Sequence, residues 1–462
     1  MVNSVKIKNN NRLLIFILFL GLILRLLYSF WLSKYLLGSV TFKIGDSFSY
    51  TNSFLNLLNY GIYSFDLDEP DAYFSRGPIY PLFWGIHYLV FGKYFVYESI
   101  AISQSVLDVF SGYLIYKIIL SLKLSHVYGL IGLIIYLINP ILIVHVPNTG
   151  TETFSIFLTL LYFYSLIKLN ARSNIYFSGL ICGICCLTRQ YLGILLPIGF
   201  IFLLLNHNNK FITKNILLLS FGFCLIVSPW VFRNLYYYKK PILLMGRTSG
   251  YQVYQEDFIA FNDFYSLFYV DVTPLFNSIA TTGKDTISNP KLFYPFYNDL
   301  IKINEMSFSC GPSFYAWRNG ILFKKDNNIA NECKYKLVND YKTLKNKIIN
   351  NRNVFFRYKI SLLNLKKSIF KFELVKKEYG FKQLFINFCF LFRTSYILLG
   401  LIALFFIRDN YKLVIFAFPL FMFIFISFYI QHVEIRFYAQ AEAILIILSA
   451  YSIFKLKSYL FS

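Results

Sequence analysis

Two charged residues near the first apolar run of the chain are of types that can do chemistry together. Asp46 follows Gly45 directly, and Arg76 comes later, inside an Arg-Gly-Pro-Ile-Tyr-Pro sequence. An aspartate is ionised at neutral pH and can accept a proton, whereas an arginine keeps its charge and offers paired donors to an anion. Asp46 also suits a structural role, because an aspartate before the stretch Ser47 to Leu58 is a favourable helix N-cap. The residues alone leave both roles open.

Ionisable residues at the ends of other apolar segments are further candidates. A charged group within or beside a membrane span is costly enough to be a functional candidate by default. Most of these groups are expected on one side of the membrane, beside the loop that holds Asp46, whereas a transporter would place them near the midplane of broken, repeated helices. We find no internal repeat. The residues concerned are Glu98, Glu152, Arg189, Arg233, Glu434 and Arg436.

Three ionisable residues lie deeper in apolar segments. Arg25 lies in the first span, and we expect a structural role for it, either extending its charge toward the surface or pairing with an acid. For Asp108 and Glu442, a hydrogen bond between helices and a direct role in chemistry are equally supported. His87, His145 and His432 do not have metal-ligand spacing, so interfacial positions are the better interpretation for them.

The composition is that of a membrane protein. Of 462 residues, 57% are hydrophobic, 20% aromatic and only 15% charged. The formal net charge of +22 would suggest nucleic-acid binding in a soluble chain. Here, however, the basic residues alternate with apolar runs of about 20 residues. Nucleic acid is therefore excluded as a partner, and membrane lipid is expected.

Apolar stretches long enough to cross a bilayer predict an all-α, polytopic membrane protein with about ten transmembrane helices. A further stretch, 78–92, has two prolines and two glycines and is short for a span, so we expect an interfacial helix in the first exterior loop. Two short segments that meet at Thr188-Arg189 predict a broken hairpin. The predicted spans are 12–33, 96–116, 127–146, 152–168, 174–189, 190–206, 214–232, 384–407, 411–430 and 437–455.

The distribution of basic residues predicts which side each loop faces. Every short loop on the expected cytoplasmic side carries lysine or arginine, which is the usual bias. Both termini are then cytoplasmic, and the first long loop, 34–95, is exterior. We expect an N-terminal transmembrane module, 1–232, an exterior domain, 233–383, and C-terminal transmembrane helices, 384–462. The lack of an Asn-x-Ser/Thr sequon favours a bacterial inner membrane, with the exterior parts in the periplasm.

The expected exterior domain has a helical pattern in its second half. Apolar residues recur there at Leu337, Tyr341, Leu344 and Ile348. Spacings of three and four residues place side chains on one face of a helix. The segment is also long enough to form a small domain of its own, and we expect it to cover or border the site.

Several short motifs, in this order along the chain, resemble a known family. The sharpest is Ser228-Pro229-Trp230-Val231-Phe232-Arg233-Asn234, followed by Gly250-Tyr251. Together the motifs resemble the integral-membrane C-type (GT-C) glycosyltransferases that use polyprenyl-phosphate sugars, especially bacterial relatives of protein mannosyltransferases and of the lipid A aminoarabinose transferase. The other motifs are Gly45-Asp46 with Tyr50 and Gly61, the Arg-Gly-Pro sequence at Arg76, Thr151-Glu152, Gly183 through Leu187-Thr188-Arg189, and Glu434-Ile435-Arg436-Phe437-Tyr438.

The resemblance implies an inverting glycosyltransferase that moves a hexose or pentose from a polyprenyl-phosphate donor to an acceptor on the exterior face. The acceptor is left open among a glycan, lipid A and a protein. A polyprenyl phosphate leaves readily as an anion, so the reaction needs a base, for which we expect Asp46, and cations for the phosphate. The expected phosphate-binding residues are Arg76 and Arg436, ranked first, with Arg189 and Arg233, and further substrate-binding candidates are Tyr50, Glu152, Asn234, His432 and Glu434.

Other features keep alternatives open. The segment after the Glu-x-Arg motif usually carries proline in similar proteins, whereas here it reads Ala439-Gln440-Ala441-Glu442.

No organic cofactor is expected, and a divalent metal is left open, because Asp46 and Glu152 could hold a cation only if the fold brings them together. The rival functions are a polysaccharide polymerase, which would make products of many lengths, and a flippase for lipid-linked oligosaccharide.

Overall fold

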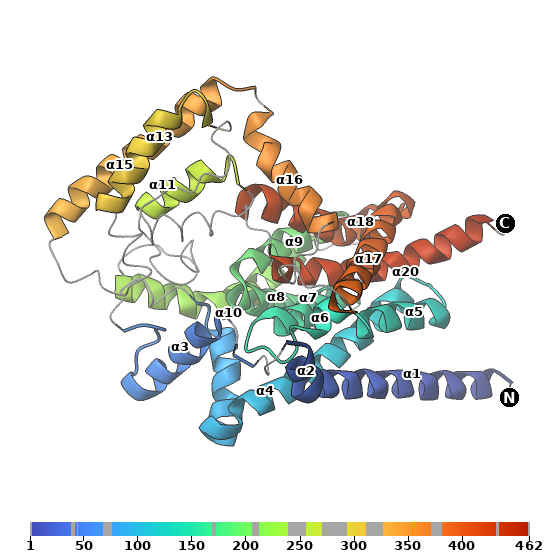
Figure 1. Cartoon of the computed structure of the whole chain (residues 1–462). Helices are drawn as coiled ribbons and strands as arrows, with labels where there is room; N and C mark the ends of the chain where they lie inside the picture. The colour runs from blue at the N-terminus through green and yellow to red at the C-terminus, as the bar shows by residue number, and fades with distance from the viewer. Residues whose placement is uncertain are drawn as a thin grey trace. The chain divides into compact units, whose positions relative to one another are not determined.

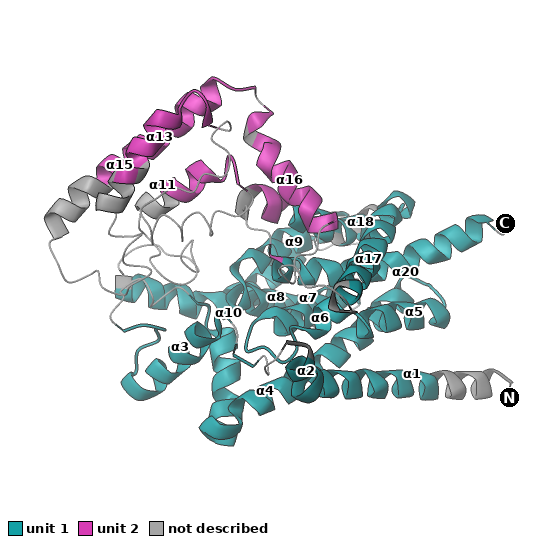
Figure 2. Ribbon diagram, in the orientation of Figure 1, with its two compact units in different colours: residues 1–245, 372–423, 435–462 teal, residues 246–371, 424–434 magenta. Residues whose placement is uncertain are grey.

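All regular secondary structure that the computed structural model describes is helical (Figure 1). No strand occurs among the described residues, so the all-α prediction is confirmed for them. Contacts divide the chain into two compact units, coloured separately in Figure 2: residues 1–245, 372–423 and 435–462, and residues 246–371 with 424–434. The described residues are 2–37, 42–43, 45–67, 76–168, 172–205, 212–238, 256–269, 293–310, 327–353, 355–370, 381–430 and 434–460.

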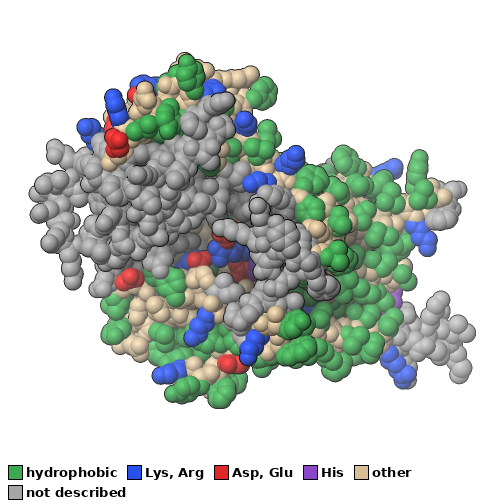
Figure 3. All heavy atoms as spheres, viewed as in Figure 1, with side chains coloured by type: hydrophobic (Ala, Val, Ile, Leu, Met, Phe, Trp, Pro, Cys, Tyr) green, Lys and Arg blue, Asp and Glu red, His purple; other side chains and the backbone are tan. Residues whose placement is uncertain are grey.

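Among the residues that the structure describes, four helices are long and apolar enough to cross a membrane. Large apolar side chains, among them Phe16, Phe221 and Phe405, stay exposed along them, and Figure 3 shows broad hydrophobic areas on the visible face of the first unit. Such extended apolar surface marks contact with lipid, so the chain is an integral membrane protein. The four helices are Asn11–Tyr35, Ile212–Tyr237, Leu384–Phe406 and Ala439–Leu460, and shorter apolar helices are His126–Leu137, Glu152–Ile167, Asn174–Thr188, Gln190–Leu205 and Lys412–Phe428.

The helices of the first unit follow the predicted apolar segments. The N-terminal helix α1 continues through a π-helical turn, η1, into α2, so the predicted span 12–33 lies within one continuous helical stretch. The elements wholly or mostly in this unit are α1 (Val2–Leu27), η1 (Tyr28–Leu32), α2 (Ser33–Leu37), α3 (Ser47–Tyr60), α4 (Ile79–Ser121), α5 (His126–Leu137), α6 (Pro140–Ile143), α7 (Glu152–Ile167), α8 (Arg172–Thr188), η3 (Gln190–Ile194), α9 (Leu195–Leu205), α10 (Ile212–Tyr238), α17 (Phe381–Ala403), η6 (Leu404–Phe406), α18 (Asn410–Phe416), α19 (Phe418–Phe425), η8 (Ile435–Phe437) and α20 (Ala439–Leu460).

Breaks in these helices fall at residues that explain them. Helix α4 is kinked at Gly92, whose φ of 69° suits glycine but strains other residues. This kink separates the predicted interfacial helix from the span that follows. The predicted span 127–146 is divided between α5 and α6 at Asn139-Pro140, because proline lacks the N–H that a continuing helix needs. Between α8 and η3, Arg189 is extended, at the position where the sequence predicted a break.

A buried ion pair joins three helices of the first unit. Arg25 of α1 donates from Nε to Asp108 Oδ2 of α4 at 2.6 Å, and from Nη1 to the Leu137 carbonyl oxygen at 2.7 Å. Tyr136 of α5 donates to Asp108 Oδ1 at 2.6 Å. Arg25 and Asp108 are both fully buried. Arg25 therefore pairs with an acid, one of the two structural roles expected for it, and Asp108 forms a bond between helices.

A second buried ion pair joins α17 to α20. Arg393 donates to Glu442 Oε1 from Nε at 2.8 Å and from Nη2 at 2.6 Å, while Tyr396 donates to Oε2 at 2.5 Å. Gly400 lets the helices approach, because a Cβ there would lie 2.7 Å from the Leu445 carbonyl oxygen. Glu442 thus takes the helix-to-helix role, and its partner is Arg393, a residue that was not among the candidates from the sequence.

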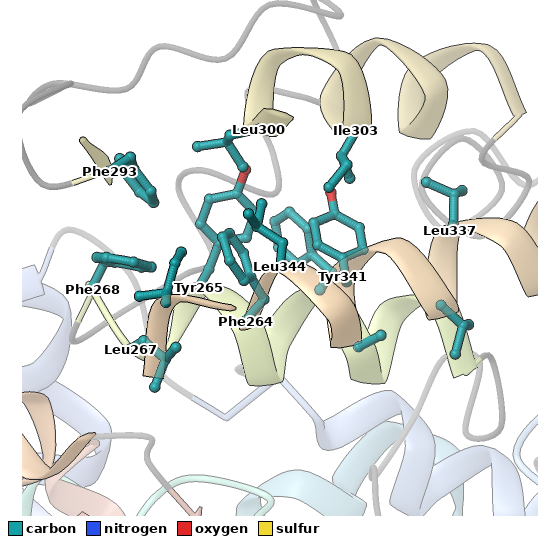
Figure 4. Packing of buried hydrophobic residues seen from close by; sticks show 14 residues of the cluster. Phe264, Tyr265, Leu267, Phe268, Phe293, Leu300, Ile303, Leu337, Tyr341 and Leu344 are labelled. Carbon is teal, nitrogen blue, oxygen red and sulfur yellow. The ribbon is translucent and has the colours of Figure 1, made fainter. Parts of the chain in front are cut away.

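The second unit has an aromatic core (Figure 4). The ring of Tyr341 lies 5.9 Å from that of Phe261 and 5.6 Å from that of Phe264, centroid to centroid. The predicted apolar face at Leu337, Tyr341, Leu344 and Ile348 is confirmed, because all four are buried in this cluster. The helices of this unit are α11 (Glu256–Tyr265), α13 (Tyr297–Cys310), α15 (Asn327–Asn350) and α16 (Phe356–Phe370), with the π-helical turn η7 (Ile426–Ile430).

Candidate active site

Asp46 lies at the N-terminal end of α3, but its side chain does not cap the helix. Its carbonyl oxygen accepts hydrogen bonds from the N–H and the hydroxyl of Ser49, at 3.0 and 2.6 Å. The carboxylate instead contacts two arginines: Oδ1 lies 3.1 Å from Arg76 Nη2, and Oδ2 lies 3.1 Å from Arg436 Nη1. The Asp46 side chain remains 34% exposed. The Asp46 carboxylate therefore contacts two guanidinium groups and remains partly exposed.

Arg76 is enclosed and held from several sides. Its Nε donates to Ser49 Oγ at 2.8 Å, and its guanidinium lies over the Tyr50 ring, 4.8 Å from the ring centre. The next residue, Gly77, touches the end of α8, because a Cβ there would lie only 1.9 Å from the Leu187 carbonyl oxygen. Only glycine allows this approach. The Arg-Gly-Pro motif thus places the arginine by packing its backbone against α8.

Arg436 comes from η8, the short turn before α20, and is less enclosed. Its side chain is 32% exposed, compared with 8% for that of Arg76. The guanidinium carbon of Arg436 lies 5.4 Å from the centre of the Phe437 ring. The Arg436 carbonyl oxygen accepts a hydrogen bond from Arg189 Nη1 at 3.2 Å. Of the two arginines that contact Asp46, Arg436 therefore has more freedom to turn toward a ligand.

A closed ring of hydrogen bonds lies beside this cluster. Arg189 pairs with the Glu152 carboxylate through Nη2 and donates from Nη1 to the Tyr191 hydroxyl at 2.7 Å. Tyr191 donates to Gln440 Oε1 at 3.2 Å, and Gln440 Nε2 donates to Ser155 Oγ at 2.5 Å. The Ser155 hydroxyl closes the ring on the Glu152 carbonyl oxygen at 2.8 Å. These five residues, called the polar ring below, tie α7, the α8–η3 junction and α20 together.

Arg233 and Asn234 support the backbone next to the cluster. Arg233 donates from Nη2 to the Tyr63 carbonyl oxygen at 2.7 Å and from Nη1 to Asn234 Oδ1 at 2.9 Å, and it stacks on Trp230. Tyr63 in turn donates its hydroxyl to the Arg76 carbonyl oxygen at 3.1 Å. Burial raises the pKa of the Tyr63 phenol well above its usual value. The hydroxyl therefore stays a donor throughout the ordinary pH range.

Most residues selected from the sequence lie in one part of the first unit. The expected base and the two arginines ranked first are in direct contact. The Glu152–Arg189 pair is linked to these three residues by the hydrogen bond from Arg189 to the Arg436 carbonyl oxygen. Two candidates are not placed there: Glu434 belongs to the second unit, and His432 lies outside the described residues. Their roles stay predictions.

Several uncharged residues that hold the site in place were not selected from the sequence. Serine, tyrosine and glutamine occur throughout the chain, so residue type alone does not single out the four that support the charged residues, by bonding to their side chains, to their backbone or to the side chains around them. Gln440 carried a signal, because it lies in the segment that departs from the pattern of similar proteins. The four residues are Ser49, Tyr63, Tyr191 and Gln440.

Side chains that commonly bind metals are spread out in the described part of the chain. No group of three or more His, Cys, Asp or Glu residues gathers there. Asp46 and Glu152 are each paired with arginine, whereas a divalent cation needs several oxygen ligands around it.

Comparison with known proteins gives one family match. Residues 75–232 match the family described as dolichyl-phosphate-mannose-protein mannosyltransferase. Among curated proteins, no sequence matches the chain. Two crystal structures of ArnT from Cupriavidus metallidurans, in the apo state and bound to undecaprenyl phosphate, match 98% and 96% of this chain and 77% and 78% of their own, at 10% and 11% identity. Their TM-scores, 0.35 and 0.39, are too low to establish a shared fold.

The matched segment contains much of the site. It includes Arg76, the Glu152–Arg189 pair and the start of the sharpest motif, while Asp46 and Arg436 lie on either side of it. The description of the matched family names a mannosyltransferase with dolichyl-phosphate mannose as the sugar donor. Over residues 75–232 the chain is thus similar to the dolichyl-phosphate-mannose-protein mannosyltransferases, and the resemblance to integral-membrane C-type glycosyltransferases expected from the motifs is confirmed.

Proposed function

We propose that this protein is an inverting glycosyltransferase that moves a monosaccharide from a polyprenyl-phosphate donor to an acceptor hydroxyl on the exterior face of the membrane. The contact of Asp46 with both Arg76 and Arg436 carries this proposal. Three motifs far apart in the sequence, which the resemblance assigns to one reaction, meet at that carboxylate. The family match over residues 75–232 supports the same class of reaction.

The cluster supplies the two kinds of group that this transfer needs. The acceptor hydroxyl attacks the anomeric carbon, a new C–O bond forms, and the proton passes to a carboxylate oxygen of Asp46. The bond between the anomeric carbon and the phosphate oxygen breaks, and the phosphate keeps the electron pair. Arg76 and Arg436 stabilise the negative charge that develops there. Attack opposite the phosphate inverts the configuration at the anomeric carbon.

Donor binding on this proposal changes the contacts of Asp46. In the structure each of its carboxylate oxygens contacts one arginine. A phosphate that binds the more exposed Arg436 competes with Oδ2 of Asp46, so phosphate binding frees one carboxylate oxygen for the acceptor proton. Arg76 stays in place, because Ser49 and Tyr50 hold it. The base therefore becomes available when the phosphate is bound.

Release of free polyprenyl phosphate tests the proposal. Purified full-length wild type and Asp46→Asn would each be given a panel of polyprenyl-phosphate sugars, with a membrane-glycan extract as acceptor source. We expect release by wild type and a loss of about 100- to 10,000-fold in Asp46→Asn, the usual contribution of a general base. Equal release by the two proteins would remove Asp46 from this role.

The matched control is Asp66→Asn, which removes a half-buried acid from the same loop. We expect this variant to keep the wild-type rate. Product analysis separates the rival functions: a transferase adds one sugar, a polymerase makes a ladder, and a flippase releases no polyprenyl phosphate. A ladder, or no release with any donor, would contradict the proposal.

A further inference from the structure

Gln440 is a buried polar residue in the segment that departs from the pattern of similar proteins. It lies in the first turn of α20, four residues after Arg436, and is fully buried. A buried amide needs partners for both its C=O and its NH₂ group. Both partners, Tyr191 and Ser155, belong to the polar ring. Without Gln440 the ring would be open between η3 and α7.

The polar ring reaches the backbone of Arg436. Arg189 Nη1 donates to the Tyr191 hydroxyl at 2.7 Å and also to the Arg436 carbonyl oxygen at 3.2 Å. The η8 turn leads directly into α20, and its end is closed by a hydrogen bond from the Tyr438 N–H to the Ile435 carbonyl oxygen at 2.9 Å. The start of α20 therefore sets the point from which Arg436 extends toward Asp46.

The first turn of α20 is fixed on two faces. Gln440 bonds it to α7 and η3, and Glu442 bonds it to Arg393 and Tyr396 of α17. A turn held on one face alone can pivot, whereas two anchors leave one orientation. A guanidinium that must meet a carboxylate, and later a phosphate, within hydrogen-bond distance needs such a fixed base.

We propose that Gln440 is a positioning residue for Arg436. By closing the polar ring, Gln440 sets the orientation of η8 from which the Arg436 guanidinium contacts Asp46 and, on the proposed function, the donor phosphate. Its effect on donor use rests on that proposed function. Its effect on the position of Arg436 does not, so the two can be tested separately.

Kinetics of Gln440→Leu test the first effect. Leucine is of similar size but makes neither amide contact. We expect KM for the polyprenyl-phosphate sugar to rise about three- to tenfold, the contribution of hydrogen bonds of this kind, with a smaller change in kcat. In an Arg436→Gln background the same substitution should add nothing, because the residue it positions is gone. A full effect in that background would overturn the positioning role.

The matched control is Ser178→Ala. The Ser178 hydroxyl lies 2.7 Å from that of Ser165, so the substitution removes one contact between α7 and α8 outside the polar ring. It should leave the donor KM unchanged. Should Gln440→Leu fail to fold, Tyr191→Phe removes the hydroxyl that bonds to both Arg189 and Gln440 while keeping the aromatic ring, and a similar rise in KM is expected.

Chemical labelling tests the second effect without turnover. Phenylglyoxal modifies exposed arginines, and mass spectrometry of the full-length protein in detergent would give the rate at Arg436. We expect Gln440→Leu to raise this rate about threefold or more, as loss of a hydrogen bond allows, and Ser178→Ala to leave it unchanged. Unchanged labelling and KM in Gln440→Leu would overturn the positioning role while the proposed function stands. Faster labelling in a protein that uses no polyprenyl-phosphate donor would support the positioning role and reject the proposed function.

Discussion

The Arg25–Asp108 pair between α1 and α4 and the Asp46–Arg436 contact use the same kinds of residue in different surroundings. Both side chains of the first pair are 0% exposed, whereas those of the second are 32% and 34% exposed. The first pair is also closed by Tyr136, which donates to the carboxylate. An enclosed pair has no path for a substrate, but a partly exposed pair can exchange one partner for a ligand. The exposed fraction of the side chains and the presence of a further hydrogen-bond donor therefore distinguish a contact that joins helices from one that is open to a ligand. The residue types do not.

Breaking the enclosed Arg25–Asp108 pair should have the largest effect of the predicted changes, and this effect is on stability. Arg25→Met leaves the Asp108 carboxylate buried without its cation. This should lower the free energy of unfolding by about 3–5 kcal/mol. The double variant with Asp108→Leu should recover most of this loss, because two apolar side chains leave no buried charge unpaired. Thermal unfolding in detergent measures both. A double variant no more stable than Arg25→Met would show that packing, and not the charge, explains the loss.

Removing the exposed cation should change donor use more than stability. Arg436→Gln should raise the donor KM about 10- to 100-fold, since a hydrogen bond to a charged group contributes about 1.5–3 kcal/mol. The free energy of unfolding should change by no more than about 1 kcal/mol, because exposed ion pairs contribute little. Donor-dependent kinetics and thermal unfolding check the two parts. A wild-type KM would assign phosphate binding to another arginine.

Removing the exposed acid should strengthen phosphate binding. In Asp46→Asn the two arginines no longer face a competing carboxylate, and two partly exposed ion pairs together amount to about 1 kcal/mol. Polyprenyl phosphate should therefore bind about three- to tenfold more tightly than to wild type, although turnover is lost. A binding titration with polyprenyl phosphate in detergent measures this, with Asp66→Asn as the control. Weaker binding would mean that Asp46 does not compete with the phosphate.

The smallest effect is expected at Arg233. Its guanidinium bonds to the Tyr63 backbone and stacks on Trp230, so its influence on Arg76 passes through Tyr63. Arg233→Gln should change the donor KM by less than about threefold, which corresponds to part of one neutral hydrogen bond. Steady-state kinetics beside Arg436→Gln give the comparison. An effect as large as that of Arg436→Gln would make Arg233 a direct phosphate ligand.

The sequence supplied more about which residues matter than about how they pair. Asp46, Arg76 and Arg436 were selected from their motifs, and the structure brings them into contact. Arg393 was missed, although an arginine inside an apolar run is as costly as Glu442 and by the same reasoning needs a partner. The breaks at Gly92 and Asn139-Pro140 follow from local backbone chemistry.

The sequence by itself determined the helical class, the membrane setting and the residue types available for chemistry. These depend on hydrophobic length, on charge distribution and on turn residues, all of which are local. Only the tertiary structure decided that the Asp46 side chain meets Arg436, 390 positions away, rather than capping α3, and that Gln440 closes the polar ring. The physical reason is that a polar side chain takes whichever partner packing brings within reach, and that partner is not encoded by its neighbours in the chain.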